Sequence, residues 1–400
     1  MLNMKLQQSK SFQSTLPFSL PFIFRQSKHG YILDCIDIHK QLAFDHPLLK
    51  NHSVQLKPTT IPKWTRDNNT SQKSTSLPFR QEEDIICPPG TVIIKRTTLE
   101  DLIQFQRLES LGLKPTSKDR NDDQPGHYTA VAQYYALNFG GKGNINVWDP
   151  QVEPDQYSLS SLYVQGGRRE DFETISAGWI VSPKLNHNHS SLFIAWSVSF
   201  SKILQVLTSS YGPSTLVKSV FFYSKQANKK GCYNTLCPGF VQVSRKFPLG
   251  SVARPVSKYG GKQYHLEISI YQERLTRDWW YVLKGEPVGY WPNPLFSYSG
   301  LAEGADNVWW GGEVFSADKN RISPIMGSGF VPQDDFGKAA YINGLRVIDR
   351  YSRKVMMPPA KDLVVYASSP TCYNVKTISR RGEYWSRAIF YGGPAGCTVR

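Results

Sequence analysis

Six cysteines are the residues of this 400-residue chain whose spacing most directly suggests chemistry. An even count that falls into one far pair, one near pair and one C-terminal pair favours three local disulfides, while six reduced thiols are the alternative in a reducing compartment. The four-residue gap between Cys232 and Cys237 also fits half of a metal site, but no second short-spaced Cys or His pair completes four ligands. We therefore rank zinc below disulfides and expect no metal or other cofactor. The three groups are Cys35 with Cys87, Cys232 with Cys237, and Cys372 with Cys397.

The formal net charge of +15 is the second chemical feature of the chain. It would suit nucleic acid, an anionic surface or an acidic substrate, but the Lys and Arg residues are scattered rather than gathered into one tract. Aromatic residues alternate with basic ones, as on a surface that binds single strands. Most Trp residues nevertheless lie inside apolar, strand-like runs, which predicts core packing. We expect a solvated basic surface with no nucleic-acid partner.

Strands are the elements that must position any site in the C-terminal two thirds. Residues 263–271 show the clearest period-two pattern, with Leu266, Ile268 and Ile270 alternating with polar neighbours. Many such strands without intervening helices predict an all-β, antiparallel β-sandwich. The predicted strands are 144–148, 157–165, 174–182, 190–200, 239–246, 263–271, 278–291, 308–315 and 339–348.

The N-terminal third has a different pattern. Residues 51–81 are rich in Ser, Thr, Asn, Lys and Pro and predict an exposed segment. The best helix follows Thr97, which has capping-box spacing to Glu100, and Gly112 can end it. The apolar, β-branched stretch at 197–229 predicts an inserted hairpin or sequence outside the core fold. The predicted organisation is a poorly formed signal segment at 1–30, a pro-region with one helix at 31–112, a linker at 113–126, and a main domain at 127–400 that contains the insertion.

Targeting signals in the sequence are weak. Residues 16–24 are apolar, but the run is short and two prolines break it, so it is a poor leader. No run of 18 or more apolar residues exists, which argues against a membrane span. Four Asn-x-Ser/Thr triplets, beginning at Asn51, Asn68, Asn69 and Asn188, are glycosylation acceptors if the chain is secreted.

Short motifs in both parts of the chain together resemble the neprosin family, which pairs an activation peptide with a peptidase domain. Each motif alone is weak, but they occur in the family's order and cover most of the chain from residue 34 onward. The pro-region motifs are DCIDIHKQLAFDHPLLKNH (34–52) and CPPGTVIIKRTTLEDL (87–102). The domain motifs are INVWDP (145–150), YSLSSLYVQGG (157–167), AGW (177–179), GCYNTLCPGFVQ (231–242), WWYV (279–282), VGYWP (288–292), WGGEV (310–314), MGSG (326–329) and FYGGPAGC (390–397).

The resemblance implies two seven-stranded antiparallel sheets packed as a sandwich, and a glutamic peptidase that cleaves after proline at acid pH. Its partners would be a proline-containing peptide or protein and its own pro-region, acting as an intramolecular inhibitor of a monomer without cofactors. The family's disulfides map onto the three cysteine pairs, which favours an extracellular or vacuolar location. Trp179, Trp310 and Tyr290 lie in the matching motifs and are candidate substrate contacts.

The resemblance also identifies the catalytic carboxylates, and here the chain departs from the family. One glutamate of the pair matches Glu313, but the other, which should precede AGW, is Ser176. Two carboxylates hydrolyse a peptide by sharing a water, one as base and the other as acid. A serine cannot serve as that base, and losing it costs on the order of 10² to 10⁴ in rate. Glu173 lies an odd number of positions from Ser176, so we expect it on the opposite face, as a surface carboxylate.

Three alternatives remain open. Ser176 could act as a nucleophile with His127 or His265 as base, although no nucleophile elbow surrounds it. The domain could instead bind Pro-rich peptide or cell-wall glycan in an aromatic groove without cutting it. The weak leader and residues 197–229 could also mark a defective gene product. Trp309, beside Trp310, either narrows a cleft near Glu313 or packs in the core.

Overall fold

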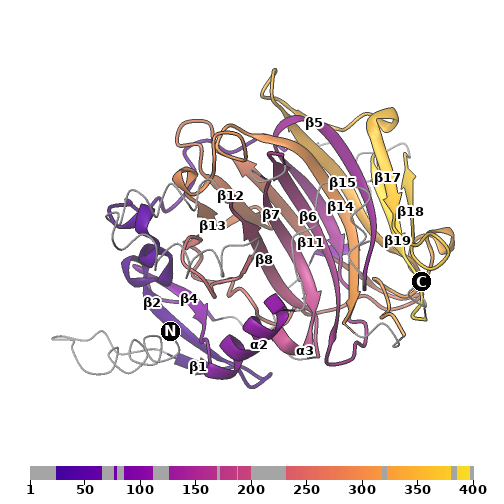
Figure 1. Cartoon of the computed structure of the whole chain (residues 1–400), viewed down its shortest axis with the longest axis horizontal. Helices are drawn as coiled ribbons and strands as arrows, with labels where there is room; N and C mark the ends of the chain where they lie inside the picture. The colour runs from indigo at the N-terminus through magenta and orange to yellow at the C-terminus, as the bar shows by residue number, and fades with distance from the viewer. Residues whose placement is uncertain are drawn as a thin grey trace.

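The computed structural model describes residues 24–64, 76–78, 85–110, 126–168, 172–186, 188–199, 231–317, 322–379 and 385–396. Within these ranges the protein is built from strands that are antiparallel except where β3 pairs with β11, and it has few helices, which confirms the predicted all-β class (Figure 1). The helices are α2 (Leu99–Ser110), α3 (Pro183–Asn186) and six 3₁₀ turns, η1 (Ile38–Lys40), η2 (Leu42–Asp45), η3 (Pro47–Leu49), η5 (Asn293–Leu295), η6 (Pro332–Asp334) and η7 (Ala360–Asp362).

The strands form a small N-terminal sheet and one large sheet. The small sheet has the order β1-β2-β4, and its strands are β1 (Phe24–Gln26), β2 (Ile32–Asp37) and β4 (Thr91–Lys95). The large sheet comprises β3 (Ser76–Pro78), β5 (His127–Asn146), β6 (Gln156–Gly166), β7 (Glu173–Val181), β8 (Ser191–Ser197), β9 (Cys232–Tyr233), β10 (Val241–Gln242), β11 (Gln263–Gln272), β12 (Trp279–Leu283), β13 (Glu286–Trp291), β14 (Ala305–Ser316), β15 (Ala340–Asp349), β16 (Val355–Met356), β17 (Leu363–Ala367), β18 (Asn374–Ile378) and β19 (Ala388–Gly392).

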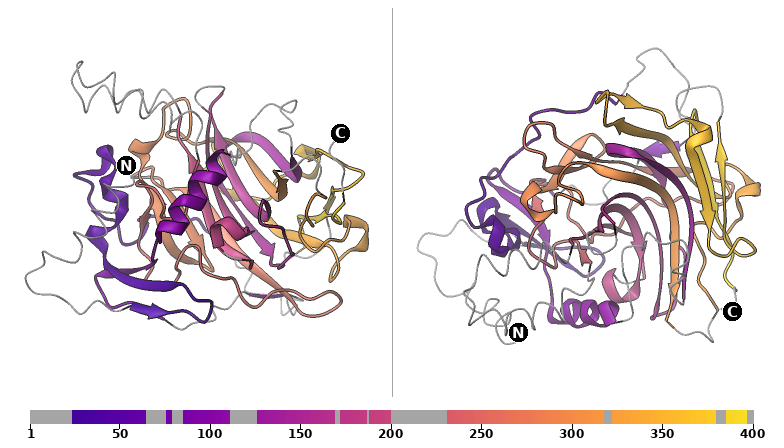
Figure 2. Two further views of the ribbon diagram at one scale, coloured as in Figure 1. Left: turned by 60° about the horizontal axis from the view of Figure 1, so that its bottom comes forward. Right: turned by 45° about the horizontal axis from the view of Figure 1, so that its top comes forward.

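Strand β5 connects two layers of the large sheet (Figures 1 and 2). Its first half pairs with β14 and β17, and its second half pairs with β11 and β15. The change of partner occurs near Gly140, where φ is +112° and a Cβ would lie 2.1 Å from the Ile270 carbonyl oxygen. Only a glycine fits such a position. The expected pair of separate seven-stranded sheets is therefore one hydrogen-bonded sheet that curls over itself.

Most predicted strands agree with the structure, and the differences have physical causes. The prediction placed only 144–148 in a strand where β5 runs from His127 to Asn146, because residues 130–134 are buried on both faces and do not alternate. The predicted strand 278–291 is two strands, β12 and β13, which turn at Lys284 and Gly285. Strand β17 was not predicted, since its Val364 and Val365 face solvent.

Side chains of β7 show how the layers pack. Ile175, Ala177 and Trp179 enter the main core, together with Leu266 and Ile268 of β11 from the other layer. The even-numbered residues of β7 point to the other face, where a second apolar cluster forms. That cluster comprises Val131, Tyr157, Leu159, Tyr163, Ile180, Leu185, Phe193, Ala195, Tyr233, Trp309 and Phe315. We call this surface the Glu313 face.

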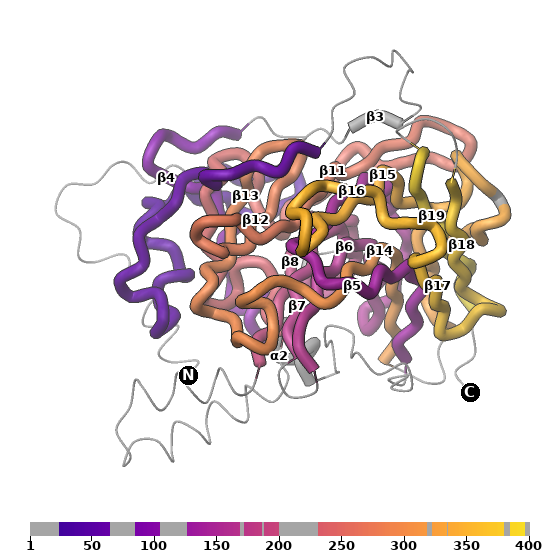
Figure 3. The backbone as a smooth tube through the Cα atoms, turned by 90° about the horizontal axis from the view of Figure 1, so that it is seen from above, coloured from indigo at the N-terminus to yellow at the C-terminus, as the bar shows by residue number. Residues whose placement is uncertain are grey.

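The N-terminal segment lies beside β12 and β13 (Figure 3) and is hydrogen-bonded to β10. Gln41 and Gln242 form a reciprocal pair, because the Gln41 amide donates to the Gln242 carbonyl at 2.9 Å and accepts its N–H at 2.8 Å. Tyr290 Oη accepts the Gln55 N–H at 3.0 Å and lies 2.7 Å from His52 Nε2. The pro-region is thus held by buried hydrogen bonds as well as by apolar contacts.

The predicted helix of the pro-region is present, but its cap is one residue later than expected. Thr98 Oγ1 accepts the Asp101 N–H at 3.1 Å, and Asp101 Oδ2 accepts the Thr98 N–H at 2.7 Å. This reciprocal pair is the capping box, and it replaces the predicted pair Thr97 and Glu100. The predicted end at Gly112, the linker at 113–126 and most of the insertion at 197–229 lie outside the described residues.

Two of the predicted disulfides are seen, Cys35 to Cys87 and Cys232 to Cys237. Cys372 is also disulfide-bonded, and its predicted partner Cys397 lies outside the described residues. Among the residues described, no helix is long and apolar enough to cross a membrane, and no cluster of His, Cys, Asp or Glu forms a metal site.

Candidate active site around Glu313

Glu313 lies in the middle of β14, between neighbours β5 and β6. The alternation of the strand sends Trp310 and Val314 into the main core and Glu313 to the opposite face. Gly312 precedes it on the core side, where a Cβ would lie 2.5 Å from the Tyr391 ring. The glycine therefore lets a large core aromatic pack directly behind the carboxylate, which explains the local sequence Trp-Gly-Gly-Glu.

Three side chains from β5 and β6 surround the Glu313 carboxylate, which is 3% exposed. Tyr157 Oη donates to Glu313 Oε1 in a short hydrogen bond. His127 Nδ1 lies 3.3 Å from the same oxygen and 3.1 Å from Tyr157 Oη. Tyr163 Oη donates to Glu313 Oε2 at 3.3 Å. Both carboxylate oxygens thus accept hydrogen bonds in a nearly water-free environment.

Burial sets the protonation state of the two tyrosines. The pKa values of Tyr157 and Tyr163 are raised well above 10, first because both hydroxyls are desolvated and second because the negative charge of Glu313 is close. Both phenols therefore remain protonated donors at any pH at which the protein is folded. They hold the carboxylate as hydrogen-bond donors.

Ser176 shares the face of Glu313 but does not touch it. The register places Trp309, Tyr163 and Ser176 in one row across β14, β6 and β7, four residues along β14 from Glu313. Tyr163 lies between the two positions, because it pairs with Ser176 and its hydroxyl reaches Glu313. The Ser176 hydroxyl is buried and donates to the Ala195 carbonyl at 3.3 Å.

Glu173 lies on the opposite face from Ser176, as its odd offset predicts, but the predicted surface position is wrong. Its side chain is fully buried, and its carboxylate accepts the N–H groups of Ser199 at 3.0 Å, Ser297 at 2.9 Å and Leu301 at 2.8 Å. Burial raises the pKa of Glu173 more than these amides lower it. Glu173 anchors loops of the core and is not available as the second carboxylate.

The aromatic residues predicted to contact substrate lie elsewhere. Trp179 and Trp310 are fully buried in the main core, where their indole N–H groups donate to the carbonyls of Asn146 at 2.8 Å and Lys142 at 3.1 Å. Tyr290 contacts the pro-region. Trp309 is on the Glu313 face instead, and its indole N–H is buried without a partner among the described residues.

Neither predicted histidine base forms a triad with Ser176 within the described residues. His127 contacts Glu313 and Tyr157 rather than Ser176, and His265 is in β11, in the other layer. Burial lowers the pKa of His265 to about 4, which suits a neutral packed imidazole. The sequence analysis missed Tyr157 and Tyr163 as site residues, although their even spacing on one strand puts both on one face.

Two family models match parts of this chain. A family model described as Neprosin matches residues 154–203 and 199–394, and one described as Neprosin activation peptide matches residues 24–138. The two Neprosin stretches overlap at 199–203, near the start of the predicted insertion, and the second contains Glu313. The matches together extend over most of the chain and preserve the order of an activation peptide followed by a peptidase domain. The chain belongs to the neprosin family.

Proposed function

We propose that the protein is the pro-form of a neprosin-type glutamic endopeptidase, directed at proline-containing peptides at acid pH, in which catalysis is severely weakened. The observation that carries the proposal is the composition of the Glu313 face. Along the described parts of β5, β6, β7, β8 and β14, Glu313 is the only carboxylate on that face, and Ser176 stands where the family has its second glutamate.

The chemistry that remains is half of a two-carboxylate mechanism. Glu313 is fixed by Tyr157 and Tyr163 and can orient a water or take its proton. No group at position 176 can donate a proton to the carbonyl oxygen or to the leaving nitrogen, since a serine hydroxyl is far too weak an acid. The loss of this step costs on the order of 10² to 10⁴ in rate.

The pro-region contributes to the proposal by its position. Its segment between β4 and α2 lines a small cavity together with the domain's own loops, and the domain residues there include Leu185 and Leu236, which pack into the cluster of the Glu313 face. The pro-region therefore reaches the edge of that face while it is anchored at Gln242 and Tyr290. This placement supports an intramolecular inhibitor that must move before a peptide can bind.

The test is hydrolysis of a proline-containing peptide by acid-treated protein, with product identified by mass spectrometry. Ser176→Glu restores the second carboxyl beside Tyr163, and Ser176→Gln is its uncharged control of matched size. We expect cleavage after proline from Ser176→Glu at least 100-fold above the natural sequence and above Ser176→Gln, with Glu313→Gln abolishing it. If Ser176→Glu is folded by its thermal midpoint yet no more active than Ser176→Gln, position 176 does not limit catalysis.

A second candidate function rests on Trp309. Its indole N–H is buried and has no partner among the described residues, on a face that also carries Tyr157 and Tyr163. Once uncovered, it could donate to the carbonyl of a bound Pro-rich peptide that is never cut. Under this hypothesis the natural sequence retains such a peptide in equilibrium binding without product, and Trp309→Phe weakens retention. Absence of binding by the pro-region-free protein would remove this candidate.

A secreted or vacuolar location is also part of the proposal. Its support is the set of disulfides, which form and persist in oxidising compartments. Thiol labelling of the protein taken from its natural tissue should find these cysteines oxidised. Mass spectrometry of its peptides should find glycan at Asn51 or Asn188. Monomeric state stays a prediction that sedimentation can check.

A further inference from the structure

Two β-hairpin turns with the same sequence pattern lie at one cavity. The turn between β11 and β12 reads Glu-Arg-Leu-Thr-Arg-Asp (273–278), and the turn between β15 and β16 reads Asp-Arg-Tyr-Ser-Arg-Lys (349–354). In both, the fifth residue donates its N–H to the carbonyl of the first, at 3.0 Å for Arg277 and 2.9 Å for Arg353. In both, the acid at the first position accepts the N–H of the Thr or Ser at the fourth, at 2.8 and 2.7 Å.

The fifth position of each turn is a left-handed position that carries an arginine. The φ angles are +64° at Arg277 and +52° at Arg353. Glycine, asparagine and aspartate are the residues that this region favours. Turn geometry alone would therefore be better served by glycine at both positions, and the arginine side chains need another explanation.

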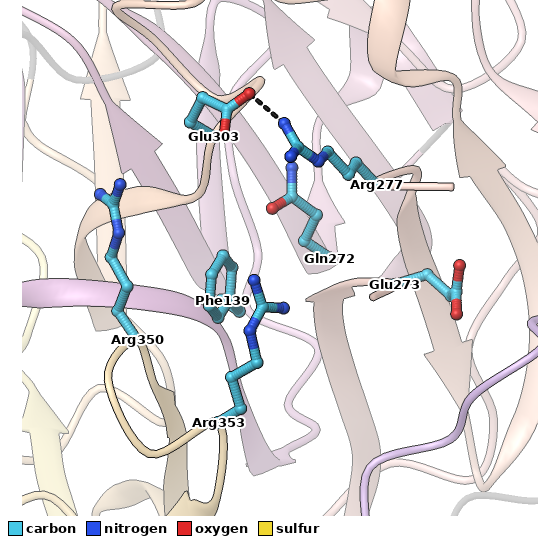
Figure 4. Close-up of a pocket in the computed structure, with 7 residues that line it drawn as sticks. All are labelled: Phe139, Gln272, Glu273, Arg277, Glu303, Arg350 and Arg353. Carbon is cyan, nitrogen blue, oxygen red and sulfur yellow. Dashed lines mark hydrogen bonds and ion pairs between the residues drawn. The ribbon is translucent and has the colours of Figure 1, made fainter. Parts of the chain in front are cut away.

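Both side chains line a cavity of about 120 Å³ (Figure 4). Its other lining residues are Phe139, Gln272, Glu273, Glu303 and Arg350. The Arg353 guanidinium stacks over the Phe139 ring, 4.1 Å from its centroid, which fixes the orientation of its N–H groups. The cavity has room for several water molecules, and hence for an anion with four oxygens.

Positive charge in this cavity is only partly balanced. Arg277 forms an ion pair with Glu303, whereas no ion pair joins Arg350 or Arg353 to a carboxylate among the described residues. The Glu273 carboxylate turns away from the arginines in Figure 4 and accepts the hydroxyls of Thr59 and Thr60 at 2.6 Å. Burial and the charges of Arg274, Arg277 and Arg350 lower the pKa of Arg353, as expected of clustered cations.

We propose that the cavity binds an oxyanion, a sulfate, phosphate or carboxylate group, between Arg350 and Arg353. Guanidinium groups present paired N–H donors that match such anions, whereas the Gln272 amide nitrogen at the cavity wall already donates to the carbonyls of Leu301 and Ala302. The tips of the two turns expose Leu275 and Tyr351, which are 71% and 86% accessible and flank the arginines. An oxyanion carried by a larger ligand, such as a sulfated sugar, would meet these side chains.

The test uses the full chain and measures binding of inorganic sulfate, inorganic phosphate and a sulfated oligosaccharide by calorimetry at constant ionic strength. Arg353→Gly removes the guanidinium while suiting the left-handed backbone, and Arg350→Gln removes the second cation. We expect saturable binding of the free anions that weakens roughly tenfold or more for each guanidinium removed, the equivalent of one charge-assisted hydrogen bond.

Two comparisons decide the outcome. Lys361→Gln with Lys376→Gln removes the same charge from other exposed positions and should leave binding unchanged, and Glu313→Gln should also bind as the natural sequence does. If the sulfated oligosaccharide binds more tightly than free sulfate, and this difference depends on Tyr351, the ligand is an oxyanion carried by a larger molecule. If the two bind with equal affinity, the ligand is a free oxyanion. Absence of saturable binding, or equal binding by the Arg350→Gln, Arg353→Gly double variant while its thermal midpoint is unchanged, would overturn the proposal.

Discussion

Acidification should destabilise the folded chain through His265. This residue lies in β11 beside β3, the short strand that pairs with residues 263–265, and it is 6% exposed. Burial lowers its pKa from 6.5 to about 4, with a smaller lowering from the Lys142 charge and an opposing effect of Glu267. The folded protein therefore keeps His265 neutral at a pH where the unfolded chain protonates it.

The sign and size follow from proton linkage. A base whose folded pKa lies below its unfolded pKa stabilises the fold fully above pH 6.5, loses that contribution as the pH falls, and changes little below pH 4. Each pKa unit corresponds to about 1.4 kcal/mol, so the loss reaches roughly 3 kcal/mol by pH 4. This is a large share of the net stability of about 5–15 kcal/mol that is typical of folded proteins.

The assay is urea unfolding followed by Trp fluorescence at pH 7.5 and pH 4, with disulfides intact, for the natural sequence and for His265→Gln. Glutamine cannot be protonated, so the free-energy difference between the two proteins should shift by about 3 kcal/mol in favour of the variant on going to pH 4. Other acid groups, among them Glu173 and Asp278, titrate in both proteins and cancel in the difference. An unchanged difference across this pH range would refute the assignment of a neutral, desolvated imidazole.

Four further changes test other parts of the structure. Glu173→Gln replaces one acceptor oxygen by a donor facing backbone N–H groups and should lower the free energy of unfolding by about 1–3 kcal/mol in urea unfolding at pH 7. Gly300→Ala should lower the free energy of unfolding by a similar amount, because its Cβ would lie 2.1 Å from Glu173 Oε2. If the effects of Glu173→Gln and Gly300→Ala on this free energy add in the double variant, the contact between the two residues is contradicted. Gln41→Leu removes the reciprocal bonds to Gln242 and should speed release of the pro-region in limited proteolysis, whereas unchanged release would show that this pair does not hold it. Tyr163→Phe in the Ser176→Glu background should lower its restored rate by roughly tenfold, and an unchanged kcat would exclude Tyr163 from orienting Glu313.

The local sequence by itself determined most strands, the disulfides that are seen and the positions of Glu313 and Ser176. Strand-like apolar runs between turn signals predicted β6, β7, β8, β11, β14 and β15, and period-two alternation was clearest in β11. The cysteine grouping predicted both disulfides seen, one between residues 5 positions apart and one between residues 52 positions apart. The motif around Glu313 and the serine at position 176 could be read directly from the sequence. The odd offset between Glu173 and Ser176 was enough to place them on opposite faces of the strand.

The tertiary structure decided which face of each strand forms the main core. Both faces of β6, β7 and β14 are buried, so hydrophobicity could not show that Trp179 and Trp310 pack inside while Trp309 lies beside the site. The local sequence could not show that Glu173 is buried, because the backbone N–H groups that bind its carboxylate belong to residues more than 20 positions away. The companions of Glu313 likewise come from β5 and β6, more than 145 positions earlier in the chain. The register that brings them together arises from long-range strand pairing, which no local pattern contains.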